Sequence, residues 1–137
     1  MKLSKLYLIA SILALCTTAE AQVILPADIA CHCILGEARG EYRTEGYKAF
    51  LAVAEVLRRR VSTQGVYGCK ASLAKELPYL RAVGLDKEAL RAWNESKHTN
   101  ITLGATHWES TDFKEPYWAK GMIKTVKIGK HQFYREE

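Results

Sequence analysis

The sequence lacks most of the motifs by which hydrolases and nucleotide-binding proteins are recognised. Its 137 residues contain no His-Glu-x-x-His run and no Cys-x-x-Cys pair, so we expect no zinc site. They contain no Gly-rich phosphate loop and no Ser or Cys nucleophile elbow. No repeat, low-complexity tract or linker interrupts the chain after residue 21. These absences predict one domain that works without a metal or another cofactor.

One long hydrophobic run is present, at Leu6–Leu15, and it is shorter than the ~20 residues that span a bilayer comfortably. Lys2 and Lys5 flank its start and Ala19-Glu20-Ala21 follows it, which is the pattern of a signal peptide cleaved before Gln22. We expect residues 1–21 to be a signal peptide and residues 22–137 to be a secreted or periplasmic domain without stable membrane insertion. A leader that is retained as an anchor is the alternative.

Charge of either sign is not in large excess. Without Lys2, Lys5 and Glu20, residues 22–137 keep 18 basic and 14 acidic side chains. A small positive excess suits an anionic cell wall, and it suits nucleic acid equally. The export pattern argues against nucleic acid as the partner, and we expect a monomer.

Few cysteines are present, and three of them, Cys31, Cys33 and Cys69, lie after residue 21. In an oxidising compartment one pair is expected to form a disulfide. Cys31 and Cys33 stand at i and i+2 of a predicted helix and point to different sides, so they are poorly placed to bridge each other. Cys69 is therefore expected to pair with Cys31 or Cys33, and the sequence leaves the choice open.

Apolar periodicity predicts a helical body. A first helix begins at Pro26 and is stopped by Gly40, and a second covers residues 47–61 with Arg58-Arg59-Arg60 in its last turn. A short helix is expected over residues 69–77, ended by Pro78.

A fourth helix is expected from an N-cap at Asp86 to about Ser96, with Leu90 and Trp93 facing inward. After Gly104 the chain becomes rich in β-branched and aromatic residues, and residues 125–134 read as strand with a bulge at Gly129. The prediction is an α+β fold, a mainly helical body with a small antiparallel β-hairpin.

The segment with most chemical content is Gly36-Glu37-Ala38-Arg39-Gly40-Glu41. Glu37 falls at the end of an otherwise apolar helix, where lost hydration favours the protonated carboxyl that a general acid needs. The alternative is a carboxylate that only pairs with Arg39 or a lysine. Glu41, at i+4, is the candidate second carboxylate, but Gly40 breaks the helix between them. We interpret Arg39 and Glu41 as structural residues near the site, with Glu41 bound to Arg39 or to a backbone N–H.

A second group of aromatic and polar residues is typical of a saccharide cleft, where rings stack on sugars and polar groups bind their hydroxyls. The candidate substrate-binding residues are Thr106, His107, Trp108, Trp118, His131 and Tyr134. We expect Thr106 and Tyr134 to approach Glu37. Trp108, Trp118 and Phe133 are equally compatible with the core, and Trp93 is assigned to it.

These pieces, taken in order, resemble the cell-wall hydrolase family typified by the spore-cortex-lytic enzymes (SleB-like), within the lysozyme-like group. The matching runs cover nearly all of residues 22–137: Leu35–Glu41, Glu45-Gly46, Ala52–Val56, Cys69, Gly104–Trp108, Pro116–Trp118 and Ile128–Tyr134. The Glu-Ala-Arg-Gly-Glu run together with the Ile-Gly-x-His-x-Phe-Tyr ending is a specific combination.

The resemblance implies a lysozyme-like fold and cleavage of the β-1,4 bond between N-acetylmuramic acid and N-acetylglucosamine in peptidoglycan glycan strands. It implies that Glu37 is the catalytic acid and that the enzyme is a lytic transglycosylase, which releases 1,6-anhydromuramic ends. The alternatives are a hydrolytic muramidase, of bacterial origin or a phage endolysin, and a non-catalytic peptidoglycan-binding protein. An amidase or peptidase is disfavoured because the sequence lacks zinc ligands and a cysteine nucleophile pairing.

The chain departs from the family pattern in two places. Members usually carry Asn-Arg near the end of the second helix, where this chain has Arg59-Arg60, and residues 70–97 contain no motif of the family. These departures concern the substrate subsites and the stem-peptide preference, and they leave Glu37 in place.

Overall fold

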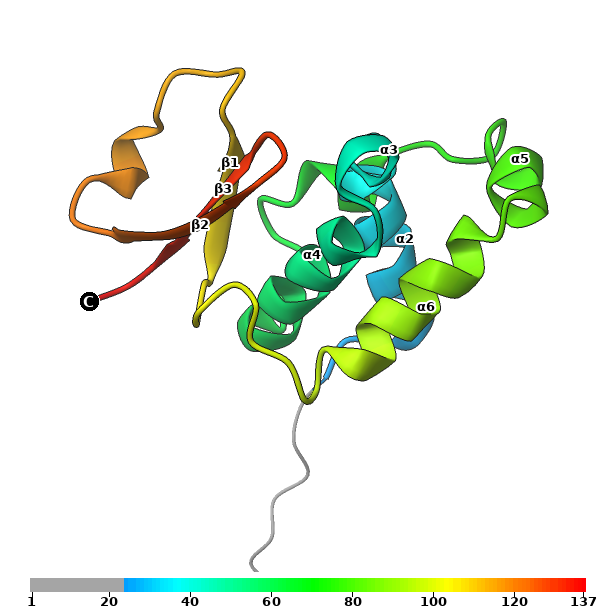
Figure 1. Ribbon diagram of the computed structural model, residues 1–137, viewed down its shortest axis with the longest axis horizontal. Coiled ribbons are helices and arrows are strands. Elements are labelled where there is room, and N and C mark those ends of the chain that lie inside the picture. Colours follow the sequence, from blue (N-terminus) through cyan, green and yellow to red (C-terminus); the bar gives the residue numbers. More distant parts are fainter. Residues whose placement is uncertain (1–23) are drawn as a thin grey trace, which may run out of the picture.

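Residues 24–137 are described by a computed structural model, in which a helical body lies beside a small antiparallel sheet (Figure 1). The predicted signal peptide, residues 1–21, and its cleavage point lie outside the described residues. Within residues 24–137, no helix has the length and apolar character needed to cross a membrane.

The helical body contains two long N-terminal helices at the positions that the sequence predicts. Helix α2 begins directly after Pro26 and ends before Gly40, and α4 ends at Arg60, one residue before the expected end. The helices of the body are α2 (Ala27–Ala38), α3 (Tyr42–Glu45), α4 (Tyr47–Arg60), the 3₁₀ turn η1 (Tyr67–Lys70), α5 (Leu77–Ala82) and α6 (Leu85–Glu95).

The predictions for the next two helices are partly wrong. Pro78 does not end a helix but lies in the first turn of α5, where its missing N–H has no intrahelical partner to lose. Asp86 lies inside the first turn of α6, whose N-cap is Gly84 at φ 79°. Leu90 is largely exposed, whereas Trp93 is buried as predicted.

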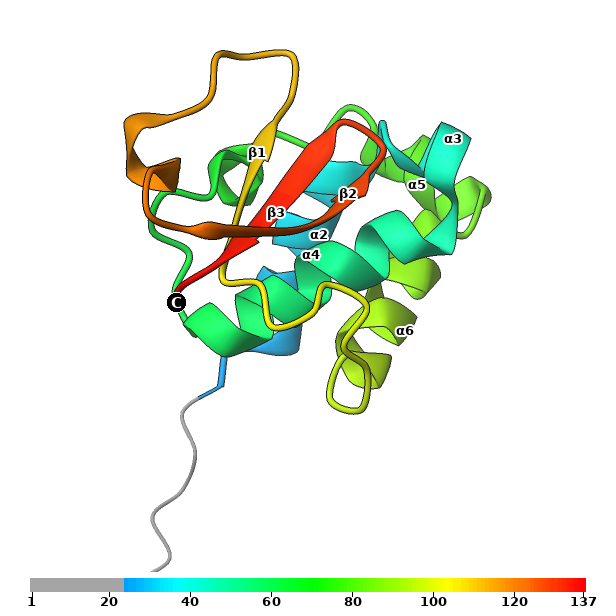
Figure 2. The same cartoon turned by 60° about the vertical axis from the view of Figure 1, so that its left-hand side comes forward.

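Helix α4 is the central element of the molecule. Every residue from Ala49 to Leu57 is buried, since α4 is covered by α2 and α6 on one side and by the sheet on the other (Figures 1 and 2). The larger core cluster includes Ile34 of α2, Phe50 of α4 and Trp93 of α6. A smaller cluster joins α4 to Ile128 and Phe133 of the sheet. A helix that is apolar on most of its circumference is expected at such a position.

The sheet has three strands rather than the two of the predicted hairpin. They are β1 (His107–Ser110), β2 (Ile123–Ile128) and β3 (His131–Arg135), in the order β1-β3-β2, and all pairs are antiparallel. Val126 and Ile128 face inward between exposed lysines, as the alternation predicts. Between β1 and β2, the 3₁₀ turn η2 (Tyr117–Ala119) lies in a long connection.

The predicted bulge at Gly129 is wrong, because Gly129 lies in the turn between Ile128 and His131 at φ 58°. The register irregularity is in β2 instead, between Lys124 and Lys127. A side chain at position 129 would place its Cβ 2.1 Å from Oε2 of Glu41. Glycine therefore allows the tip of the β2–β3 hairpin to pack directly on the start of α3.

Candidate active site

Glu37 lies in the last turn of α2, and its carboxyl group accepts two hydrogen bonds from distant parts of the chain. The backbone N–H of Gly68 in η1 donates to Oε1 at 2.6 Å, and Nε1 of Trp108 in β1 donates to Oε2 at 3.3 Å. The side chain is half-buried. Since each oxygen has its own donor, the rotamer and the orientation of the carboxyl group are fixed.

A close contact between two glycines allows the first of these bonds. A Cβ on Gly36 would lie 2.0 Å from the carbonyl oxygen of Gly68, and a Cβ on Gly68 would lie 2.4 Å from the backbone nitrogen of Glu37. Any side chain at either position would separate η1 from α2. The glycines thus bring the backbone of η1 within hydrogen-bond reach of Glu37.

A disulfide between Cys33 and Cys69 joins the same two elements. Cys33 lies one helical turn before Gly36, and Cys69 follows Gly68, so the covalent link is next to the glycine contact. The prediction that Cys69 pairs with Cys31 or Cys33 is confirmed, with Cys33 as the partner. Cys31 is a free, half-buried thiol, and burial raises its pKa, with a smaller contribution from Asp28.

Arg39 does not pair with Glu37 or with Glu41. Its Nε and Nη2 bind the carboxylate of Glu76 at 2.7 and 3.2 Å, and its Nη1 donates to the carbonyl of Gly36 at 2.8 Å. Arg39 therefore binds a free carbonyl at the C-terminal end of α2 and connects it to the segment before α5. The alternative reading, in which Glu37 only pairs with Arg39 or a lysine, is not supported, because no ion pair of Glu37 is found within residues 24–137.

Glu41 has the structural contact that was predicted as one of two options. The helix is interrupted after Ala38, and Oε2 of Glu41 accepts a hydrogen bond from the backbone N–H of Lys130 at 3.1 Å. Glu41 thus attaches the β2–β3 turn to the helical body. It does not line the cavity next to Glu37.

Glu37 opens into a cavity of about 570 Å³ between the helical body and the sheet, which we call the Glu37 cleft. Four of the predicted substrate-binding residues, His107, Trp108, Trp118 and His131, line it together with Glu37. The other lining residues are Arg60, Gly65, Tyr67, Glu109, Ser110 and Phe113. A cleft with aromatic walls and convergent polar groups has the composition of a ligand site.

Thr106 and Tyr134 do not line the Glu37 cleft, contrary to expectation. Successive strand residues point to opposite faces, and Phe133 faces α4, so Tyr134 is buried on the other face, where its ring meets the edge of Trp118 at 5.3 Å. The Thr106 hydroxyl contacts Nδ1 of His107 at 2.9 Å. The position next to Glu37 belongs to Trp108, about 7 Å further along the chain from Thr106 at the usual strand rise.

Trp108 belongs both to the cleft and to the core. Its indole N–H reaches Glu37, while its ring packs against both core clusters and stands 6.3 Å from the ring of Phe133. Phe133 itself is fully buried. The sequence left open whether Trp108 is a cleft residue or a core residue, and the structure shows that it is both.

Two exposed aromatic residues of the cleft had no signal in the sequence. Tyr67 in η1 is 83% exposed and Phe113 in the β1–β2 connection is 70% exposed, and both line the Glu37 cleft. They lie in irregular segments, where no periodicity marks a residue as facing a cavity. Glu109 was missed too, although its place in the strand directly after Gly104–Trp108 could have indicated it.

Both histidines of the cleft have a pKa lowered from the ordinary value of 6.5, which favours the uncharged imidazole at neutral pH. Burial lowers the pKa of His131 from 6.5, and the carboxylates of Glu37, Glu41 and Glu109 oppose that shift without cancelling it. Burial also lowers the pKa of His107, and Arg60 lowers it further. Each imidazole can therefore donate through one nitrogen and accept through the other.

A buried carboxylate holds the segment that leads into β1. Glu55 of α4 accepts hydrogen bonds from the hydroxyls of Thr99 and Thr102 and from the backbone N–H groups of Ile101 and Thr102, at 2.6 to 3.0 Å. Burial alone would raise the pKa of Glu55, but these donors outweigh it and lower the pKa below 4.5.

The three arginines at the end of α4 have separate partners. Arg58 donates to Ser96 at 2.9 Å and stacks on the ring of Trp93, which ties α4 to α6. Arg59 donates to the hydroxyl of Thr102 at 2.7 Å and to the carbonyl of Ala105 at 2.8 Å, beside Glu55. Arg60 donates to the carbonyl of Gln64 and lines the Glu37 cleft. Arg59 thus supports the segment that leads into β1.

Metal-ligating side chains do not gather within residues 24–137, where no three His, Cys, Asp or Glu residues lie close enough to hold a metal ion together. The side chains that line the Glu37 cleft include carboxyl groups, imidazoles and aromatic rings, which are available for acid–base chemistry and for binding a ligand.

Comparison with known proteins supports the fold. The catalytic domain of the Bacillus cereus SleB protein superposes with a TM-score of 0.56 at 23% sequence identity, over 85% of this chain and 99% of that domain. This chain has the same fold as that domain. The α+β fold predicted from the sequence, a mainly helical body with a small antiparallel sheet, is thereby confirmed. No family model and no curated protein sequence matches the chain.

Proposed function

We propose that this protein is an exported lytic transglycosylase that cleaves the β-1,4 bond between N-acetylmuramic acid and N-acetylglucosamine in peptidoglycan. The observation that carries the proposal is the position of Glu37, a carboxyl group held by two N–H donors at one wall of a cleft lined with aromatic rings. The motifs shared with the SleB-like family and the shared fold support the same activity. The Cys33–Cys69 disulfide is in keeping with an oxidising compartment outside the cytosol.

The reaction needs one carboxyl group that works twice. Protonated Glu37 donates its proton to the glycosidic oxygen as the bond to C1 of muramic acid breaks. The resulting carboxylate then removes the proton from the C6 hydroxyl of the same sugar, whose oxygen bonds to C1 and closes the 1,6-anhydro ring. The nucleophile belongs to the substrate, so the enzyme does not have to hold a water molecule or form a covalent ester.

The other residues of the cleft fit the binding of a sugar chain. Tyr67 and Phe113 offer exposed rings on which sugar rings can stack, and neutral His131 can hydrogen-bond a sugar hydroxyl. Trp108 fixes the orientation of the Glu37 carboxyl group. We assign substrate binding to Tyr67, Phe113, Trp108 and His131, together with His107 and Trp118. Thr106 and Tyr134 are supporting residues of the sheet.

A second candidate function, a hydrolytic muramidase, is favoured by Glu109. This carboxylate lines the same cleft as Glu37, whereas Glu41 is engaged at the hairpin turn. In a hydrolase, the second carboxylate would activate a water molecule or form the glycosyl ester.

The decisive experiment is mass spectrometry of peptidoglycan digested by the wild type, Glu37→Gln and Glu109→Gln. A transglycosylase yields 1,6-anhydromuropeptides, and Glu37→Gln lowers their rate of release by about 10²- to 10⁴-fold because the general acid is lost. Reducing muramic ends, lost in Glu109→Gln as well, would establish the muramidase instead. Lysis by Glu37→Gln at the wild-type rate would show that the site is misassigned.

A further inference from the structure

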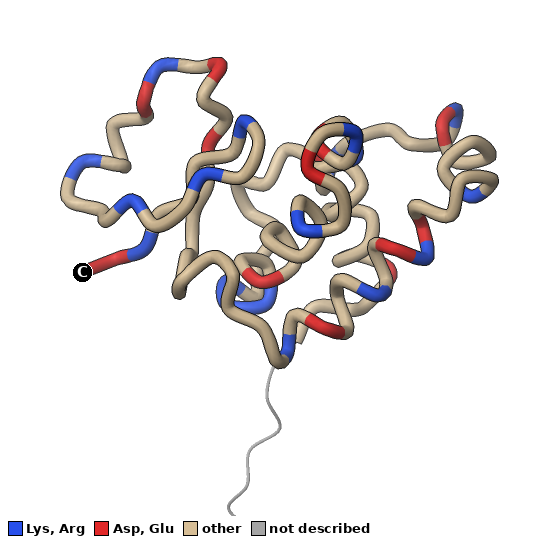
Figure 3. Tube along the Cα trace, viewed as in Figure 1, with Lys and Arg blue, Asp and Glu red and all other residues tan. Residues whose placement is uncertain are grey.

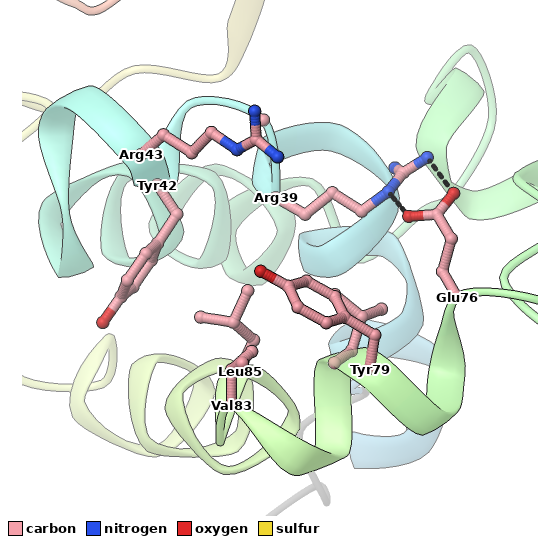
Figure 4. A pocket seen from close by; sticks show the side chains of 9 residues that line it. Arg39, Tyr42, Arg43, Glu76, Tyr79, Val83 and Leu85 are labelled. Atoms are coloured by element: carbon pink, nitrogen blue, oxygen red, sulfur yellow. Dashed lines mark hydrogen bonds and ion pairs between the residues drawn. The ribbon is translucent and has the colours of Figure 1, made fainter.

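A second cavity, of about 480 Å³, lies on the other side of α2 from the Glu37 cleft. The end of α2 and helix α3 form one side of it, and α5 and the start of α6 form the other (Figure 4). We call it the Arg43 pocket, and its walls include Tyr42, Arg43, Tyr79, Val83 and Leu85. It shares no lining residue with the Glu37 cleft. Its α5 side belongs to residues 70–97, which contain no motif of the resembled family.

The walls of the Arg43 pocket expose apolar surface. Tyr79 is 61% exposed and Val83 is 50% exposed, above the buried Leu80. Figure 4 shows the rings of Tyr42 and Tyr79 on either side of Leu85 and Val83. A ligand with small apolar groups would remove this surface from water, which favours binding.

One edge of the pocket carries a single available cation. Arg39 is fully occupied by Glu76 and by carbonyl groups of α2. Arg43 projects from α3 at the rim and is exposed, and no ion pair or hydrogen bond engages its guanidinium within residues 24–137. Glu76 is neutralised by Arg39, so the pocket has one unpaired positive charge. That composition suits one carboxylate attached to small apolar groups.

We propose that the Arg43 pocket binds the stem peptide of the peptidoglycan strand whose glycan lies in the Glu37 cleft. The inference rests on the proposed function and adds a specificity site to it. A carboxylate of the stem peptide binds the guanidinium of Arg43, and alanine methyl groups contact Tyr79 and Val83. The stem peptide is anionic, contains alanine and is attached to the muramic acid beside the scissile bond, so its chemistry matches the pocket.

The distances allow both sites to be filled by one substrate. Gly40, which lines the pocket, follows Glu37 by three residues, so their Cα atoms are at most about 11 Å apart. An extended stem peptide of four residues spans about 14 Å. A peptide of this length is therefore long enough to reach from the Glu37 cleft to the Gly40 edge of the Arg43 pocket.

The test compares two substrates, soluble glycan strands that carry stem peptides and strands stripped of them by an amidase. The wild type is expected to have the higher kcat/KM on peptide-bearing strands. Arg43→Ala is expected to lower the ratio of the two kcat/KM values by about tenfold, the range of one charge-assisted hydrogen bond. Arg43→Lys, which keeps the positive charge, is expected to lower this ratio less than Arg43→Ala does. Arg81→Ala, an exposed arginine of α5 outside the pocket, is the matched control and leaves the ratio unchanged.

Thermal unfolding of each variant establishes that it is folded. A further variant, Val83→Glu, places a negative charge on the apolar wall of the pocket, where it would repel the carboxylate of the stem peptide. A wild-type ratio near one, or an Arg43→Ala variant that loses activity equally on both substrates, would overturn the stem-peptide site while leaving the transglycosylase in place. If the wild type cleaves neither substrate, the proposed function is wrong and the pocket assignment is wrong with it.

Discussion

At the scale of single residues, the candidate acid depends on groups that are far away in the sequence. The two donors to Glu37 come from residues 31 and 71 positions further along the chain. Gly68 is the more demanding of them, because only a residue without a side chain brings its N–H to the carboxyl group. Its contribution is therefore steric as well as electrostatic.

Gly68→Ala is predicted to reduce lytic activity by about 10²-fold or more. The new Cβ would lie 2.6 Å from Cγ of Glu37, so either η1 or the carboxyl group must move, and a displacement of about 1 Å at a catalytic group is expected to cost about that much. The rate of release of muropeptides measures the effect. Gly40→Ala, whose Cβ meets no atom within 4 Å, serves as the control for stability and should unfold at the wild-type temperature. A fully active Gly68→Ala would contradict the assigned role of this contact.

The exposed rings of Tyr67 and Phe113 are predicted to contribute to substrate binding. In the Glu37→Gln background, Tyr67→Ala or Phe113→Ala should weaken the affinity for soluble glycan strands about fivefold, as expected for about 1 kcal/mol of lost aromatic contact. Isothermal titration calorimetry measures it. Tyr117→Ala is the matched control, because Tyr117 is 87% exposed and lies outside the cleft. Equal affinities in all three variants would remove both rings from the site.

At the scale of elements, the position of η1 against α2 is fixed by a covalent bond and by packing together. The Cys33–Cys69 disulfide closes a segment with a sequence separation of 36 residues, which contains α3 and α4. Restricting the unfolded chain by a loop of this length contributes about 3–4 kcal/mol to stability in the loop-entropy description.

Reduction of the Cys33–Cys69 disulfide is therefore predicted to lower the free energy of unfolding by about 3–4 kcal/mol. Activity should fall as well, because η1 supplies the Gly68 donor to Glu37. Urea unfolding with and without dithiothreitol measures the first effect, and Cys31→Ala, which lacks only the free thiol, should respond like the wild type. Unchanged stability after complete reduction would show that noncovalent packing alone holds η1.

At the scale of the whole molecule, the cleft exists because the sheet stands against the helical body along α4. Ile128 and Phe133 pack on this helix, and the Glu55 and Arg59 network attaches the segment that enters β1. Lys and Arg residues are spread over both halves of the molecule among Asp and Glu residues (Figure 3). Neither half of the trace therefore carries charges of one sign only, and we expect recognition to depend on the two cavities.

Acid is predicted to destabilise the protein in two pH windows. His131 and His107 have pKa values below 6.5 in the folded state, so the unfolded chain binds more protons and stability falls as the pH drops below 6.5. Glu55 has a pKa below 4.5, so its contribution is present above 4.5 and is lost as the pH falls further. Thermal unfolding across pH measures both. His131→Gln should reduce the loss of stability between pH 6.5 and 5 and should leave the loss of stability below pH 4.5 unchanged. An unchanged slope between pH 6.5 and 5 in this variant would exclude His131 as the cause.

The sequence by itself determined the helices around Glu37, the alternation of Val126 and Ile128 and the fold class. It also determined that Cys69 is bridged to one of two cysteines. These features follow from local rules, since apolar periodicity and helix-ending residues act over a few positions. Where local rules competed, as at Pro78 and at Asp86 beside Gly84, the sequence is compatible with two helix boundaries, and the fold uses the one that was not predicted.

Only the tertiary structure decided which groups meet at the site. It put Trp108 rather than Thr106 beside Glu37, brought Tyr67, Phe113 and Glu109 into the cleft, and left Glu41 at the hairpin turn. It also formed the Arg43 pocket, by bringing the end of the Leu35–Glu41 run next to α5, which carries no motif. The physical reason is that these contacts join residues tens of positions apart through close backbone approaches and strand register. Such geometry depends on the packing of the entire chain, and no local pattern encodes it.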